Sequence, residues 1–406
     1  MKMFNLSRTH ANLIILGIIM TPVFGISEVL ALISGALTSQ SVALTPVYIK
    51  ALKDIVFIAI IMIGIVEVSV RRRIFLNSSY AAFIVTVVCS IFLSLYFKNF
   101  LTILAGFRWI LPVLIIPFIY RSVATNLQNR IAKWMITLFI LGLLLQIAQL
   151  FLIKGWYGLN SFGLSKRNPG FYLIPSSMAC FSALTAYYAC FYCTISSLRR
   201  SIVFVLVPVS ILLTASATGF IALALLWGYL LYCKFKQKLV LAITITVFFI
   251  GLLAMMPILT DREDIYVSLL DRSDILSEVV SLKNIFVSPD FGDATNTAML
   301  LRTVMENGEK TSFIVDSTAT SLIYNTGMLS FVFFAGFLYY SLRNAANKAN
   351  ISFFLVISPF VVTSILFELF PANLLLMVNI AFFYKQGNYW TSPGFVDNHQ
   401  GGVRAV

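Results

Sequence analysis

The sequence predicts an all-α polytopic membrane protein with about 12 transmembrane helices and one large polar loop. Of its 406 residues, 59% are hydrophobic and only 11% are charged, whereas a soluble domain carries about 25% charged residues. The apolar residues form runs long enough to cross a hydrocarbon core, which needs about 20 residues per helix. The carboxylates gather in one stretch, residues 260–317.

Twelve apolar runs predict the spans in chain order. They lie near residues 11–35, 53–70, 79–97, 101–120, 134–153, 171–196, 201–214, 218–233, 239–259, 318–341, 351–369 and 373–384. The seventh and eighth are short, and the last two join through a tight turn at Pro371. The chain thus divides into a bundle of nine spans (1–259), the large loop (260–317), three more spans (318–385) and a cytoplasmic tail (386–406).

The distribution of Lys and Arg predicts the orientation of the chain. With the N-terminus in the cytoplasm, the inner loops hold seventeen of these residues and the outer loops hold eleven. Basic residues favour cytoplasmic loops, so both termini are expected inside and the large loop outside. The net charge of +13 is scattered between apolar runs. It therefore reports topology and does not indicate a nucleic-acid partner.

The large loop holds 11 of the 16 carboxylates. An unpaired charge in hydrocarbon costs several kcal/mol, so this loop is expected in water, and an acidic outer face is where the protein would work. Within it, Ile275, Val279, Leu282 and Phe286 recur at helical spacing. This pattern predicts an amphipathic helix that lies on the membrane surface or packs on its own loop.

Histidine is scarce, which limits the chemistry available on the outer face. His10 lies at the cytoplasmic end of the first span and His399 in the tail, so both are expected away from that face. A reaction there would use carboxylates and cations in place of an imidazole base.

Arg108 is the most costly residue to place, because it falls near the middle of a predicted span. A central arginine costs about 2.5–3.5 kcal/mol on insertion scales. Two interpretations stay open. Arg108 forms a structural ion pair with Glu28 of the first span, or it binds an anion such as a lipid phosphate inside the bundle.

The outer segment 154–172 combines cations with aromatic rings. Lys154, Lys166 and Arg167 alternate with Trp, Tyr and Phe residues. Such cations hold phosphate oxygens through charge-assisted hydrogen bonds, and aromatic rings offer flat faces for sugars. An interfacial aromatic belt is the alternative, but it does not explain three cations on the translocated side.

Several other residues are candidates for a functional role. Asp316 opens an apolar run, where it serves either as a helix N-cap or as a base that deprotonates a hydroxyl. Asp290 and Asp293 could hold a divalent cation, but a D-x-x-D spacing alone is a weak signal. Cys190 and Cys193 form one C-x-x-C without a second pair, which favours buried thiols over a zinc site. We therefore expect no metal and no cofactor.

The order of these features resembles the Wzy-type O-antigen polymerases, within the O-antigen polymerase and ligase superfamily. Four stretches carry the resemblance: RNPGFYLIPSSMA from Arg167, LLTASATG from Leu212, DRSDILSEVVSLKNIFVSPDFGDATN from Asp271, and VDSTATSLIYNTGMLS from Val315. There are two departures. Ala217 replaces an arginine of the family's Ser-Arg-Thr turn, and Asp316 lies where ligases carry a histidine, which favours a polymerase.

The resemblance implies glycosyl transfer between undecaprenyl-pyrophosphate-linked oligosaccharides at the periplasmic face of a bacterial inner membrane. It implies a GT-C-like helical bundle and a partner protein that regulates chain length. Arg167 and Arg272 would bind the donor pyrophosphate, with Lys166 beside them and Arg108 as a further anchor. Asp316 would orient or deprotonate the acceptor sugar. The alternatives are an O-antigen ligase and a flippase for the same lipid-linked unit.

Overall fold

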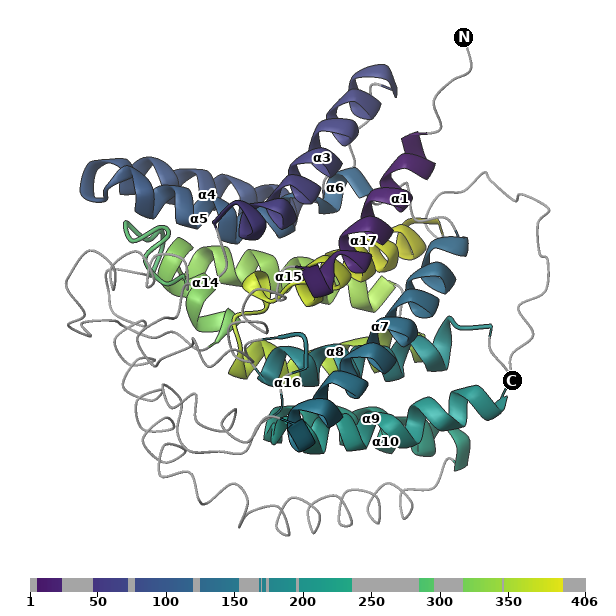
Figure 1. The fold of residues 1–406 in the computed structure, drawn as a ribbon. Helices are drawn as coiled ribbons and strands as arrows, with labels where there is room; N and C mark the ends of the chain where they lie inside the picture. The colour runs from purple at the N-terminus through teal and green to yellow at the C-terminus, as the bar shows by residue number, and fades with distance from the viewer. Residues whose placement is uncertain are drawn as a thin grey trace.

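Helices account for all the regular secondary structure in the part of the chain that the structure describes (Figure 1). This computed structural model describes residues 6–23, 47–71, 77–119, 125–152, 168, 170–172, 175–194, 197–235, 285–295, 317–344 and 347–389. Its helices are α1 (Leu6–Ile19), α3 (Val47–Arg71), α4 (Ser78–Phe97), α5 (Phe100–Leu114), α6 (Ile116–Ile119), α7 (Thr125–Leu152), α8 (Pro175–Phe191), α9 (Ser197–Thr214), α10 (Ala217–Phe235), α14 (Thr318–Thr326), α15 (Met328–Asn344), α16 (Lys348–Thr363), the short 3-10 helix η4 (Leu366–Glu368) and α17 (Ala372–Tyr389). The all-α prediction is confirmed for these residues.

Four of the described helical stretches are long and apolar enough to cross a membrane. They are Ser78–Phe97, Phe100–Ile119, Leu127–Gln149 and Ala217–Lys234. Five shorter apolar helices accompany them, in α1, α9, α15, α16 and α17. The predicted span 239–259, the predicted amphipathic helix up to residue 284 and the tail from residue 390 lie outside the described residues.

The prediction of one continuous span over residues 318–341 is wrong. The helix breaks at Gly327, whose φ of +94° suits glycine. A Cβ at this position would lie 2.4 Å from the backbone oxygen of Phe286. Another segment thus approaches the break so closely that no side chain would fit there, and hydropathy does not record such a contact. The predicted span 351–369 is also too long, because α16 ends at Thr363 and a turn follows.

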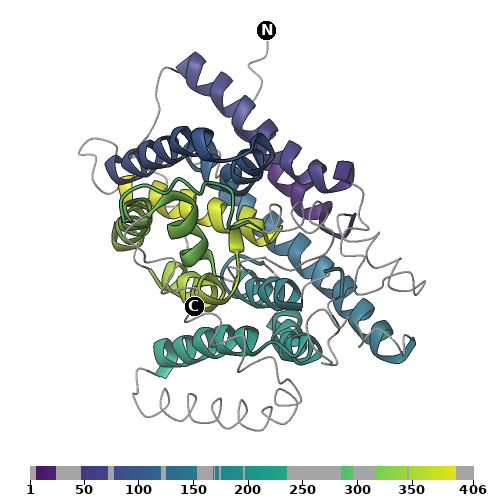
Figure 2. The same cartoon turned by 90° about the vertical axis from the view of Figure 1, so that its left-hand side faces the viewer.

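Two helices form the centre of the bundle. Nearly every described side chain of α8 and α17 is buried, whereas the surrounding helices α3, α4, α5 and α10 expose rows of large apolar side chains. Figure 2 shows the green and yellow C-terminal helices between the purple and blue helices on one side and the teal helices on the other. An apolar outer surface around a packed interior is what a bilayer requires of a helical bundle.

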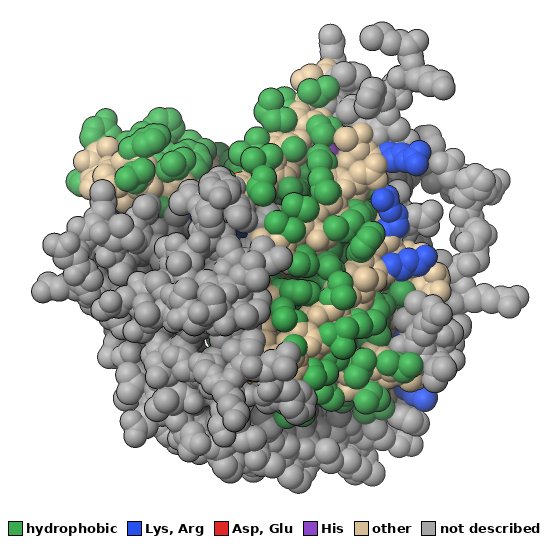
Figure 3. Space-filling view, viewed as in Figure 1, with side chains coloured by type: hydrophobic (Ala, Val, Ile, Leu, Met, Phe, Trp, Pro, Cys, Tyr) green, Lys and Arg blue, Asp and Glu red, His purple; other side chains and the backbone are tan. Residues whose placement is uncertain are grey.

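The two ends of the bundle differ in charge. Basic side chains mark one end, where Figure 3 shows Lys and Arg along the right-hand edge beside an apolar surface. This basic end carries residues at the start of α1, α7, α9 and α16 and at the end of α10 and α15: Arg8, Arg130, Lys133, Arg200, Lys348, Lys234 and Arg343. At the opposite end, here called the loop end, α4, α9 and α16 finish and α14 begins (Figure 1).

Candidate functional site

One part of the predicted large loop is packed into the bundle at the loop end. This docked segment, residues 285–295, lies against α4, α5 and α14, and most of it from Ser288 to Thr295 is buried. The expectation that the loop's carboxylates all lie in water is therefore wrong for Asp290 and Asp293, which are 3% and 9% exposed.

Hydrogen bonds from two helices hold the backbone of the docked segment. Ser94 of α4 accepts a hydrogen bond from the N–H of Phe291 at 3.0 Å. Asn325 of α14 accepts from the N–H groups of Gly292 and Ala294 at 3.0 and 3.1 Å, and its Nδ2 donates to the Ala294 oxygen at 3.2 Å. A buried amide that serves a loop backbone in this way satisfies groups that would otherwise be costly to bury.

Lys98, at the end of α4, neutralises the buried carboxylates. Its Nζ lies 2.7 Å from Asp290 Oδ1 and also forms an ion pair with Asp293 Oδ2. Burial lowers the pKa of Lys98, but hydrogen bonds and charge from both carboxylates outweigh this effect and raise it overall. The ammonium lies where a cation bridging the two carboxylates would lie. The alternative of a divalent cation at the D-x-x-D pair is thus replaced by an ion-paired lysine.

A second chain segment is fixed to the loop end by glutamines of α7. Gln146 Nε2 donates to the backbone oxygen of Asn168 at 2.8 Å. Gln149 accepts from the N–H of Gly170 at 3.0 Å and donates to its oxygen at 2.8 Å. The N–H of Asn168 donates to the oxygen of Leu213 at 2.8 Å. The residue after Arg167 is therefore bonded to the last turn of α9.

Hydroxyl groups join α14, α10 and the end of α16. Thr318 Oγ1 donates to the Ser364 oxygen at 2.5 Å and accepts from the N–H of Leu366 at 2.7 Å. The hydroxyls of Thr218 and Thr363 lie 3.0 Å apart. These contacts fasten the start of α14, two residues after Asp316, to the turn that precedes α17.

Arg108 forms an ion pair within the bundle. Its Nε lies 2.8 Å from Oδ2 of Asp54 in α3, and the two side chains are 26% and 20% exposed. The structural partner is therefore a carboxylate that the sequence analysis did not single out, while the proposed partner Glu28 lies outside the described residues.

Four of the predicted site residues lie outside the described residues: Lys166, Arg167, Arg272 and Asp316. Asn168 follows Arg167 in the chain, and Ser317 follows Asp316. Both are described, and both form hydrogen bonds at the loop end, to the backbone oxygens of Leu213 and Val361. Two ion-pair partners were not predicted from the sequence: Lys98, which pairs with Asp290 and Asp293, and Asp54, which pairs with Arg108.

Neither a scan against protein-family models nor a search of curated proteins finds a match to this chain. Among the described residues, no group of three or more His, Cys, Asp or Glu side chains could hold a metal ion.

Proposed function

We propose that the chain is a Wzy-type O-antigen polymerase, a glycosyltransferase of the bacterial inner membrane. It joins undecaprenyl-pyrophosphate-linked repeat units at the periplasmic face, within a GT-C-like bundle of about twelve spans. The loop end would face the periplasm, and the basic end with both termini would face the cytoplasm.

One observation carries this proposal: hydrogen bonds connect all four stretches on which the resemblance rests. Asn168 bonds to Leu213, and Asn325 bonds to the backbone of Gly292 and Ala294. The end of α16 links the two pairs, because Thr363 contacts Thr218 and Ser364 accepts from Thr318. Short degenerate motifs that are far apart in sequence but meet at one end of a bundle are expected of a shared site.

The proposed reaction needs few protein groups. A pyrophosphate is already a good leaving group, so cations that stabilise its developing charge supply much of the catalysis. Arg167 and Arg272 would bind the pyrophosphate, with Lys166 and Arg108 contributing charge. Asp316 would orient or deprotonate the acceptor hydroxyl, and the bundle would hold donor and acceptor in line.

The test uses cells that lack the gene and carry variants on a plasmid. Arg167→Ala and Arg272→Ala should each abolish long glycan chains on a lipopolysaccharide gel and leave core plus one repeat unit. Arg302→Ala, which removes an arginine of the same loop that the proposal does not use, is the matched control and should keep the full ladder. Normal ladders from both alanine variants would reject the residue assignment.

The deletion strain separates the alternatives. A polymerase defect leaves core bearing a single unit, whereas a ligase defect leaves core with no unit attached. A flippase defect traps lipid-linked units at the cytoplasmic face, where a periplasmic glycosidase cannot reach them. Either of the last two patterns would replace the polymerase assignment.

A further inference from the structure

A row of exposed side chains runs along the outer face of α7. Its members, Lys133, Thr137, Ile140, Leu144 and Ile147, follow one another at spacings of three and four residues, and all are exposed. Residues at these spacings lie on one side of a helix, and a row of this length covers about 21 Å. Because the stretch Leu127–Gln149 is long and apolar enough to cross a membrane, we expect this row to face lipid.

Basic side chains mark one end of the row. Lys133 begins it, and Arg130 lies one helical turn earlier on α7, where both side chains are exposed. The next residue, Trp134, keeps 39% exposure. A tryptophan beside basic residues at the end of an apolar span is typical of the level of the lipid headgroups.

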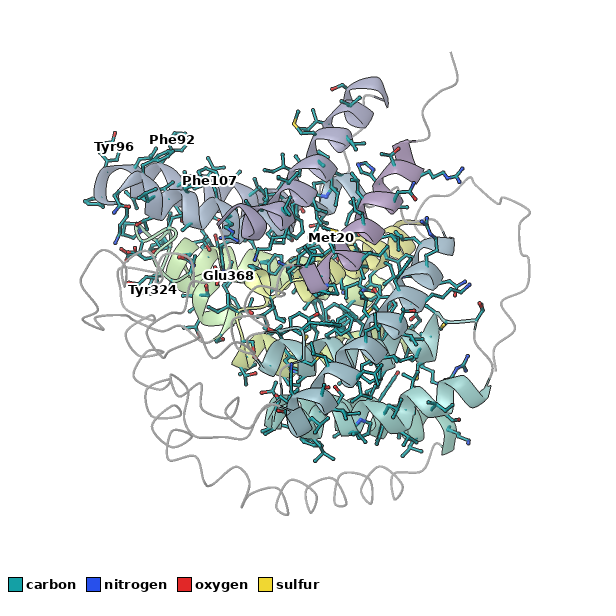
Figure 4. The ribbon with its side chains drawn as sticks, viewed as in Figure 1. Met20, Phe92, Tyr96, Phe107, Tyr324 and Glu368 are labelled. Carbon is teal, nitrogen blue, oxygen red and sulfur yellow. The ribbon has the colours of Figure 1, made fainter. Side chains whose placement is uncertain are left out.

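The start of α1 adds a third basic residue at the same place. Arg130 Nη2 donates to Asn12 Oδ1 at 3.1 Å, which joins α7 to α1. Arg8 precedes Asn12 by one helical turn, and both are exposed. Figure 4 shows side chains that end in nitrogen extending outward at this edge, while Met20, just after α1, lies toward the centre of the view. Arg8, Arg130 and Lys133 form one group, here called the α1–α7 cluster.

No described carboxylate neutralises the α1–α7 cluster. In the part of the chain that the structure describes, none of its three basic residues forms an ion pair. The acidic residues of that part lie in α3, the docked segment and η4, not in α1 or α7. Arg130 uses one N–H for its bond to Asn12, and a guanidinium has five. Unpaired cations at the end of an apolar face suit an anion that is attached to an apolar chain.

We propose that the α1–α7 cluster binds the headgroup phosphate of an anionic phospholipid and that an acyl chain of this lipid lies along the exposed row of α7. Arginine and lysine hold phosphate oxygens through charge-assisted hydrogen bonds, and basic sites between helices at the cytoplasmic side suit anionic headgroups. A lipid fits better than a free phosphate, because the apolar row starts at Lys133 and exceeds the depth of one leaflet, about 15 Å. The site lies at the basic end, away from the loop end, and does not depend on the proposed reaction.

The experiment uses Trp134 as a reporter of the lipid beside α7. The purified full-length protein is placed in phosphatidylcholine vesicles that contain a fraction of phosphatidylglycerol with brominated acyl chains, because bromine quenches tryptophan fluorescence at short range. The difference between the wild type and Trp134→Phe isolates the signal of this residue. Compared with the same fraction of brominated phosphatidylcholine, phosphatidylglycerol should be preferred by about fivefold or more, since each basic residue beside an anionic surface contributes about fivefold.

Two double variants remove equal charge from the same end of the bundle. Arg8→Gln with Lys133→Gln, which leaves Arg130 unchanged, should lower the preference for phosphatidylglycerol by about fivefold or more. Arg343→Gln with Lys348→Gln, on α15 and α16, is the matched control and should keep the wild-type preference. An unchanged preference in the first variant, or an equal loss in both, would overturn the proposed site.

Salt and free phosphate provide tests that need no variant. Salt screens exposed charges, so the wild-type preference should fall at high ionic strength, and a preference that does not change with salt contradicts the proposal. Inorganic phosphate should displace the lipid no more than chloride does at equal ionic strength. Stronger displacement would mean that the ion alone is the ligand. Equal quenching by the two brominated lipids would reject a specific site, and no quenching by either would show that another protein surface covers α7.

Discussion

Gly292 shows how closely the docked segment fits the bundle. A Cβ at this position would lie 2.0 Å from the backbone oxygen of Thr102, and φ is +93°. Neither a backbone oxygen of α5 nor this left-handed conformation can adapt to a side chain. We therefore predict that Gly292→Ala lowers the free energy of unfolding by about 4 kcal/mol or more, a cost typical of severe steric mechanisms. Thermal unfolding of the purified protein in detergent measures the change.

Gly336→Ala provides the control for this prediction. A Cβ there meets only Ser79 Oγ at 3.9 Å, an ordinary contact within α15. Because alanine favours helix over glycine by about 1 kcal/mol, this variant should be as stable as the wild type or slightly more stable. Equal unfolding temperatures for Gly292→Ala and the wild type would show that the segment does not pack against α5 in this way.

Single residues were predicted better than their partners. The sequence singles out Arg108, Asp290 and Asp293 as residues that are costly to bury or able to bind. It cannot pair them, because Lys98 lies 195 positions from Asp293 and only the folded bundle brings them together. Charge alone identifies a residue that needs a partner, whereas packing decides which partner it has.

At the scale of elements, Lys98 anchors the docked segment to α4. Replacing it by methionine would leave two carboxylates, each at most 6% exposed, without their cation. Removing one partner of a buried ion pair costs about 3–5 kcal/mol. We expect Lys98→Met to lower the free energy of unfolding by about 3 kcal/mol, near the lower limit of this range, because the Lys98 side chain keeps 24% exposure. Chemical or thermal unfolding of the purified protein gives the value.

A rescue variant tests the cause of this loss. The triple variant Lys98→Met, Asp290→Asn, Asp293→Asn removes the charges together and should recover most of the stability. The pKa of Lys98 is raised above 10.5 in the folded protein. The stabilisation that Lys98 provides is therefore complete below pH 10.5 and is lost as the pH rises through the pKa of Lys98 in the folded protein. Lys98→Met should lack this alkaline loss, and a triple variant no more stable than Lys98→Met would contradict the ion-pair explanation.

Most elements follow from hydropathy, but their breaks do not. The stretches around 79–97 and 101–120 were predicted as spans and form α4 and the α5–α6 pair, because twenty apolar residues favour a helix in a bilayer whatever their neighbours are. The break at Gly327 depends on Phe286, and the end of α16 at Thr363 depends on the turn bonded to Thr318. Contacts between distant segments set these boundaries, so they cannot be predicted from local composition.

At the scale of the whole molecule, the candidate site depends on three separate anchoring contacts. Glutamines of α7, Asn325 of α14 and Thr318 hold three chain segments at the same end of the bundle. All three use neutral polar side chains, which cost less to bury in a membrane bundle than charges. The motifs lie next to predicted spans in the sequence. The hydrogen bonds that anchor them join residues far apart in the chain, so the sequence alone did not predict these contacts.

The gathering of basic residues at one end of the bundle leads to the last prediction, which concerns orientation. Basic residues mark the end where α10 finishes, whereas α7 finishes at the loop end. Because bilayers retain basic loops on the cytoplasmic side, an in-frame green fluorescent protein after Lys236 should fluoresce, and alkaline phosphatase inserted there should be inactive. Insertions after Gly158, beyond the end of α7, should give the reverse. Fluorescence after Gly158 together with active phosphatase after Lys236 would place the loop end in the cytoplasm. That orientation would contradict the proposed function, because the proposed reaction takes place at the periplasmic face.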